Sequence, residues 1–215
     1  MREAFQGELA RLGTALRDMA LFAADAMRDA TTALLTADLD LAQQVLGRDA
    51  RLDVLRDESE EQAHTLLALQ APVAGDLRVV LAAVHCAEKL ERMGDLAAHV
   101  AGTTRIAHPG RVVPAELEDS FVELGKITTG MADRVAEFIT EPAEGVFPDL
   151  ERTDESVDEV HARVLARITG PEWSHGAASA STLALVARFY ERFGDQAVSV
   201  ARRVEYAATG SLPRG

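Results

Sequence analysis

The chain has 215 residues, of which 47% are hydrophobic and 27% charged, so it is long enough to bury a core and too apolar for a disordered protein. Its net charge of −13 argues against a nucleic-acid-binding protein, which needs a basic face for the phosphate backbone. The N-terminal segment is charged and amphipathic, no stretch is apolar enough to span a membrane, and the single cysteine excludes an internal disulfide. These features predict a soluble, cytoplasmic protein.

Hydrophobic residues recur at alternating steps of three and four over residues 5–34, which predicts a first long helix. Asp38 is the expected N-cap of a second helix, and Pro72 and Gly75 are expected to end it. The same periodicity predicts four further helices, over about 77–105, from 117 to beyond 138, over about 147–168, and from about 177 to about 208. Few aromatic residues and few β-branched runs agree with an all-α fold.

The clearest linker is the segment HPGRVVPAE at residues 108–116, which contains two prolines and a glycine. It divides the six helices three and three, so residues 1–107 and 117–215 are predicted to form two units. Short connections between long helices favour antiparallel neighbours. The sequence therefore predicts two tandem three-helix bundles.

An internal repeat supports this division, because the pentads ERMGD (91–95) and ERFGD (191–195) are one hundred residues apart at matching places in the two halves. Each half also has a pair of aspartates, four residues apart, on the helix before the pentad. On the helical wheel these carboxylates border the packing face. They are the candidate metal ligands: Asp49, Asp53, Glu91 and Asp95 in the first half, and Asp154, Asp158, Glu191 and Asp195 in the second.

Carboxylates four residues apart on a helix repel, and burying them unpaired is costly, so something must compensate their charge. One explanation is pairing with nearby arginines, for which the candidates are Arg56, Arg92, Arg188, Arg192 and Arg202. The other is a multivalent cation, since oxygen-only ligand sets suit hard ions such as Mg, Ca, Mn or Fe. Gly94 and Gly194 lower the helix propensity, and their recurrence indicates close helix packing beside each site.

The two pentads, the acidic pairs before them and the segment Pro72-x-x-x-Asp76-Leu77-Arg78 resemble the PhoU family over nearly the whole chain. The resemblance implies a non-enzymatic negative regulator of phosphate uptake and phosphate-starvation signalling. Its implied partners are the ATPase subunit of a phosphate ABC transporter and a sensor histidine kinase, which would bring it to the membrane only peripherally. The resemblance also implies a homodimer, and Fe, Mn, Zn or Mg ions at the eight carboxylates.

The second half departs from the family pattern, because nothing there matches Asp76-Leu77-Arg78, and because His99 of the first half is replaced by Ser199. The two sites are therefore expected to differ. An alternative is a carboxylate-bridged di-metal enzyme or metal store of the ferritin type, suggested by Glu61-x-x-His64. The second motif that such a protein would need, Asp158-x-x-His161, is out of phase with the repeat. Separately, His161 is a candidate additional ligand of the carboxylate site in the second half. A third possibility is a purely structural bundle with arginine-paired carboxylates.

Overall fold

The structure, a computed structural model, describes residues 2–70 and 72–211, so Ala71 in the predicted break lies outside the described residues. The described residues form six long α-helices and one short 3₁₀ turn, with no strand among them. The elements are α1 (Arg2–Thr36), α2 (Leu39–Gln70), α3 (Ala74–Ala107), η1 (Ala115–Leu117), α4 (Glu118–Thr140), α5 (Val146–Thr169) and α6 (Gly176–Thr209). This confirms the predicted all-α fold class. Among these elements, no helix is long and apolar enough to cross a membrane.

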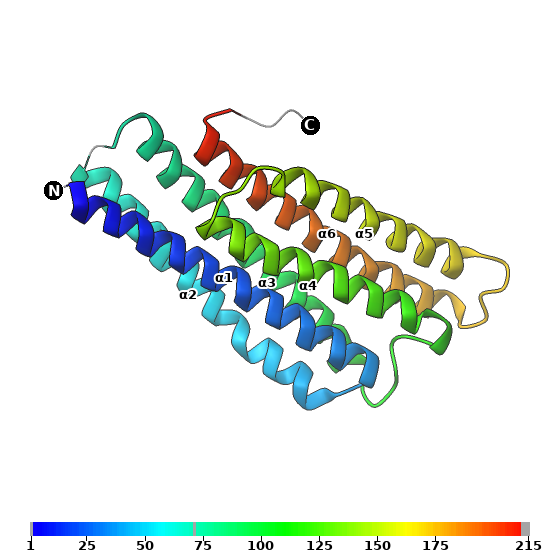
Figure 1. The fold of residues 1–215 in the computed structure, drawn as a ribbon. Coiled ribbons are helices and arrows are strands. Elements are labelled where there is room, and N and C mark those ends of the chain that lie inside the picture. The colour runs from blue at the N-terminus through cyan, green and yellow to red at the C-terminus, as the bar shows by residue number, and fades with distance from the viewer. Residues whose placement is uncertain (1, 71, 212–215) are drawn as a thin grey trace.

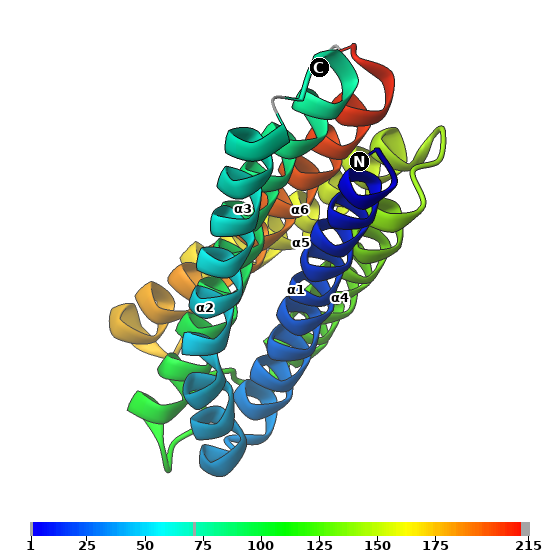
Figure 2. The same ribbon diagram turned by 90° about the vertical axis from the view of Figure 1, so that its left-hand side faces the viewer.

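The six helices lie side by side along one long axis (Figures 1 and 2). Within the first half α1, α2 and α3 all contact one another, and in the second half α4 and α6 contact each other and α5. The halves are joined because α1 packs against α4 and α3 packs against α6. Four central helices (α1, α3, α4 and α6) therefore form a shared core, and α2 and α5 flank it on opposite sides.

Side chains near the predicted boundaries bond to the helix ends. The Asp38 carboxylate accepts a hydrogen bond from the backbone N–H of Leu41 at 2.9 Å, which confirms Asp38 as the cap of α2. In the linker, the Arg111 guanidinium donates to the carbonyl of Leu35 at the end of α1 and forms an ion pair of 2.8 Å with Glu118 at the start of α4. The linker thus ties the end of one half to the beginning of the other.

The centre of the core contains one buried polar contact between the halves. The Tyr190 hydroxyl on α6 lies 2.9 Å from the hydroxyl of Thr31 on α1, and Thr31 also donates to the carbonyl of Met27. Gly125 on α4 makes room for this contact, because a Cβ at that position would lie 2.5 Å from Thr31 Cγ2. The close approach of three helices here depends on glycine.

The C-terminal end of α6 packs against the beginning of α3. Gly210 ends α6 with φ +76°, a left-handed conformation that favours glycine, and its N–H donates to the carbonyl of Tyr206. A Cβ at Gly210 would lie 3.0 Å from the Arg78 guanidinium. Arg78, part of the motif that carries the family resemblance, therefore lies beside the carbonyl end of α6, where a cation is favourable.

Candidate metal centre

The first carboxylate cluster (Asp49, Asp53, Glu91 and Asp95) lies where the flanking helix α2 packs against α3. Arg56 connects the two helices, because its Nη1 lies 3.6 Å from Asp53 Oδ1 and 3.4 Å from Glu91 Oε1. Burial raises the pKa of Glu91, repulsion from Asp95 adds to the rise, and Arg56 opposes it. The pKa of Asp49 is raised by burial and then by the charges of Asp95 and Asp53. The structure therefore brings the four predicted residues into one electrostatic group that already contains a cation.

Asp95 has further partners on its own helix. Arg92 Nη1 lies 2.8 Å from Asp95 Oδ2. The imidazole Nδ1 of His99 lies 2.6 Å from the backbone carbonyl oxygen of Asp95, and the His99 ring packs edge-on against Phe189 of α6 at 5.1 Å between centroids. The imidazole therefore connects the edge of the first cluster to the second half of the chain.

The second carboxylate cluster (Asp154, Asp158, Glu191 and Asp195) occupies the matching place, where α5 packs against α6. The pKa of Asp154 is raised to about 7, chiefly by burial and then by the charges of Asp195, Asp158 and Glu191. Burial also raises the pKa of Glu191 and of Asp195, and Arg188 opposes both rises. Arg188 reaches Glu191 directly in an i, i+3 ion pair.

Two buried oxygens in the second cluster, Asp154 Oδ1 and Glu191 Oε2, have no hydrogen-bond partner among the described residues. The reason is visible in the repeat: Arg56 follows Asp53 by three residues in the first half, and the matching residue after Asp158 is His161. Burial and the nearby Arg188 lower the pKa of His161, which favours the neutral imidazole. Among the described residues, α5 therefore supplies no cation within ion-pair distance of Asp154 or Asp158.

The glycine of each pentad allows the flanking helix to approach. A Cβ at Gly94 would collide with the Leu52 side chain of α2, and a Cβ at Gly194 would collide with the Asp154 carboxylate of α5. Close helix packing was predicted for both glycines, and the structure confirms it. The neighbour differs, since it is apolar in the first half and a carboxylate oxygen in the second.

A sequence model of the PhoU domain matches the chain twice, at residues 16–104 and 121–204. The chain belongs to the PhoU family. The two matched segments each contain one pentad and the acidic pair before it, so the repeat seen in the sequence is the domain repeat of the PhoU family.

Curated relatives show the same similarity over their full length. The chain is 41% identical over 213 residues to the phosphate-specific transport system accessory protein PhoU homolog 1 of Mycobacterium leprae, covering 99% of this chain and 96% of the relative. It is 40% identical to the homolog 2 of Mycobacterium tuberculosis, covering 99% of this chain and all of the relative.

Two crystal structures share the fold. PhoU from Pseudomonas aeruginosa superposes with a TM-score of 0.86 at 23% identity and covers 96% of this chain and 100% of that one. The phosphate transport system regulatory protein PhoU from Streptococcus pneumoniae gives a TM-score of 0.87 at 21% identity, with 98% and 100% coverage. At this level of identity the likeness establishes the arrangement of helices.

The two clusters differ in how well their residues fit the metal sites that the sequence predicts. The donors are all carboxylate oxygens, which suit hard cations. Within residues 2–70 and 72–211, no three carboxylate, imidazole or thiol side chains converge closely enough to hold one ion, so ion binding requires the carboxylates to move together. The second cluster fits better, because two of its buried oxygens lack partners. In the first cluster, Arg56 and Arg92 already supply positive charge.

The residues that suggested a ferritin-like site lie elsewhere. Glu61 and His64 are both exposed on α2, and Glu61 lines a groove between α1 and α2. His161 is half-buried and electrostatically coupled to Asp158, so it lies beside the second cluster as the sequence suggested. A difference between the two clusters was expected from His99 and Ser199. The presence of Arg56 in the first half and of His161 at the matching position in the second gives a more direct physical cause for it.

Proposed function

We propose that the chain is a non-enzymatic accessory protein of a phosphate-specific transport system that represses phosphate uptake and phosphate-starvation signalling when phosphate is abundant. The observation that carries the proposal is the 41% identity over 99% of the chain to a protein with that accessory role in its name. Its partners would be the transporter ATPase subunit and a sensor histidine kinase in the cytoplasm. The carboxylates with raised pKa values are clustered at helix interfaces, which suits a binding role.

Gene deletion in the source organism tests the regulatory role. Loss of the protein should switch on a phosphate-starvation reporter in phosphate-rich medium, and wild-type protein supplied in trans should restore repression. A reporter that stays repressed in the deletion strain would refute the proposed role. Measurement of phosphate uptake in the same strains separates an effect on the transporter from an effect on signalling alone.

Docking is proposed to use the acidic surface, because the net charge is −13 and the two carboxylate clusters lie at the flanking helices α2 and α5. Basic cytoplasmic faces of the partners would complement this charge. The double variant Asp95→Ala, Asp195→Ala should lose capture of the ATPase subunit and of the kinase in pull-down assays, and wild-type capture should weaken at high salt. Capture that is the same at low and high salt would contradict an electrostatic docking surface.

We further propose that divalent or trivalent ions (Fe, Mn, Zn or Mg) bind the carboxylate clusters, with Asp154 and Glu191 as the leading ligands of the second cluster. The support is the pair of unpartnered buried oxygens there and the repetition of the carboxylates. A bound ion would supply positive charge at the α5–α6 interface and so attach the flanking helix to the core.

Elemental analysis of untagged protein tests the metal sites. Wild type should contain stoichiometric metal, and the quadruple variant Glu91→Ala, Asp95→Ala, Glu191→Ala, Asp195→Ala should lose it. Folded wild-type protein that takes up no added divalent ion would show that arginines alone balance the carboxylates. Light scattering in the same preparations measures the molar mass and tests the proposed homodimer.

A further inference from the structure

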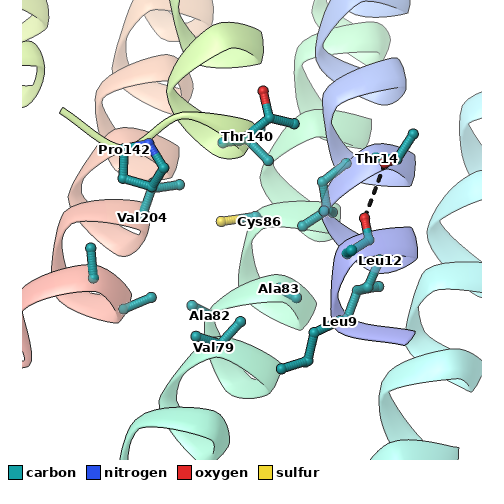
Figure 3. Close-up of a pocket in the computed structure, with 16 residues that line it drawn as sticks. Leu9, Leu12, Thr14, Val79, Ala82, Ala83, Cys86, Thr140, Pro142 and Val204 are labelled. Atoms are coloured by element: carbon teal, nitrogen blue, oxygen red, sulfur yellow. Dashed lines mark hydrogen bonds between the residues drawn. The ribbon is translucent and has the colours of Figure 1, made fainter. Parts of the chain in front are cut away.

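A cavity of about 430 Å³ lies at the end of the core where α1 and α3 begin and where α4 and α6 end (Figure 3). This volume lies within the range of small-molecule binding pockets. Leu9 and Leu12 of α1, Val79 of α3 and Val204 of α6 form opposing parts of its wall. None of the eight candidate metal ligands lines the cavity, so it is a separate feature of the molecule.

The chemistry of the wall is apolar and uncharged. None of the described residues that line the cavity is Asp, Glu, Lys, Arg or His. Its two threonine hydroxyls are committed to their own helices, since Thr14 donates to the Ala10 carbonyl at 3.0 Å and Thr140 to the Glu137 carbonyl at 3.2 Å. The Cys86 thiol lies 4.0 Å from the carbonyl oxygen of Val200, and burial raises its pKa to about 12. The wall thus offers an apolar contact surface, and the protons of its two threonine hydroxyls are already donated within their own helices.

Gly13 contributes an independent indication that the space is maintained. It is half-buried in α1 and lines the cavity, and a Cβ added there would meet nothing within 4 Å. Glycine in a helix interior costs about 1 kcal/mol relative to alanine. Its backbone angles do not require glycine, unlike those of Gly210, and no neighbour excludes a side chain, unlike at Gly125. Glycine at this position leaves that part of the cavity wall without a side chain.

We propose that this cavity binds a single aliphatic chain, carried by a fatty alcohol, a fatty acid or a membrane lipid, with the polar head group at the mouth. The volume suits one small ligand, and the uncharged wall suits the methylene groups of an aliphatic chain. Val79 lies at the mouth with 36% of its surface exposed, which provides an apolar entrance. The connection between α2 and α3, whose flanking residues Leu69 and Val73 are each 74% exposed, lies at the same end of the bundle as the N-terminus of α1 (Figure 1).

A fluorescence assay with N-phenyl-1-naphthylamine, an uncharged apolar dye, tests the cavity. The wild type should bind the dye saturably and 1-dodecanol should displace it. Gly13→Leu, which fills the cavity, should weaken both affinities at least tenfold. The matched control is Gly47→Leu on α2, an exposed helical glycine whose added Cβ also meets nothing within 4 Å, and it should bind like the wild type.

Folding of the filled variant is checked by its melting temperature, which should not fall, because leucine has the higher helix propensity and its Cβ meets nothing within 4 Å. Ala83→Met, which fills the cavity from α3, provides a second variant should Gly13→Leu fail to fold. Absence of saturable binding to the wild type, or equal binding to folded filled variants, would overturn the proposal.

Sedimentation with phosphatidylcholine vesicles distinguishes a membrane lipid from a free amphiphile as the source of the aliphatic chain. The neutral head groups of these vesicles do not repel a protein of charge −13. Co-sedimentation that is lost in Gly13→Leu would identify a membrane lipid chain. Displacement by dodecanol without co-sedimentation would identify a free amphiphile. Neither result depends on phosphate regulation or on metal binding.

Discussion

Asp154→Asn should stabilise the metal-free protein, because Asp154 is the carboxylate that folding makes hardest to ionise. Its pKa is about 7 in the folded chain against an ordinary 3.8, owing to burial and to three neighbouring carboxylates. A folded-state pKa above the unfolded one means that the folded state keeps a proton that the unfolded state releases. Stability therefore falls as the pH rises from about 4 to about 7, and the full cost applies above pH 7.

The size of this cost follows from linkage. The whole difference in pKa corresponds to about 4 kcal/mol at 1.36 kcal/mol per pKa unit. The carboxyl group is only half-buried, so solvent screening reduces the expected cost to about 1–2 kcal/mol. Asparagine has the same shape without the charge. For a chain of this length the gain corresponds to about 2–8 °C in melting temperature.

The assay is urea and thermal unfolding of both proteins in EDTA between pH 4 and pH 8. The advantage of Asp154→Asn should be largest at pH 8 and should shrink towards pH 4. Asp49→Asn is the matched control in the first cluster, where Arg56 is present, and it should give a smaller gain. If Asp154 ligates a cation, excess Mn²⁺ should reverse the order at pH 8, because only the wild type keeps the ligand. A variant less stable than the wild type at pH 8 in EDTA would refute the electrostatic reasoning.

Three further predictions concern the core. Gly125→Ala should lower the free energy of unfolding by about 2 kcal/mol because its Cβ meets Thr31. Gly130→Ala on the same helix meets nothing within 4 Å and should raise it by about 1 kcal/mol; equal effects in urea would contradict the packing argument. Tyr190→Phe should cost about 1 kcal/mol for its hydrogen bond to Thr31, and an unchanged urea midpoint would show that the bond contributes nothing. Gly210→Ala should cost about 1 kcal/mol at its φ of +76° and speed hydrogen exchange in the last turn of α6; unaltered exchange there would argue against the strained cap.

Helices and their ends could be predicted from local sequence, because periodicity and capping act within a few residues. The Asp38 cap and the long apolar stripe of α1 are examples, and both are present in the structure. The contacts of α1 with α4 and of α3 with α6 could not be predicted in the same way. An apolar stripe of alanine, leucine and valine fits many partner helices, and the choice depends on pairs such as Thr31 and Gly125 that lie far apart in sequence.

The sequence was enough to predict which carboxylates form each cluster. It was not enough to predict which cations pair with them. Helical spacing and the repeat place each acidic pair beside a pentad, and the structure brings each set of four together. The pairing of Arg56 with Glu91 depends on the distance between two helices, which spacing along one helix does not specify. One sequence feature could have indicated the difference in charge between the clusters: Arg56 in the first half is matched by His161 in the second.

This exchange leaves the carboxylates at the α5–α6 interface less fully paired than those at the α2–α3 interface. Both flanking helices are held to the core by apolar residues, and both interfaces contain four carboxylates, yet among the described residues only α2 places a cation of its own, Arg56, within ion-pair distance of its carboxylate cluster. At α5 the opposing charge comes from Arg188 of α6, and two buried oxygens are left without partners. A cation or a basic side chain of a partner therefore has more to gain at α5 than at α2. If docking or metal binding regulates the protein, the change in helix packing should begin at α5, and hydrogen exchange in α5 should respond more strongly than in α2.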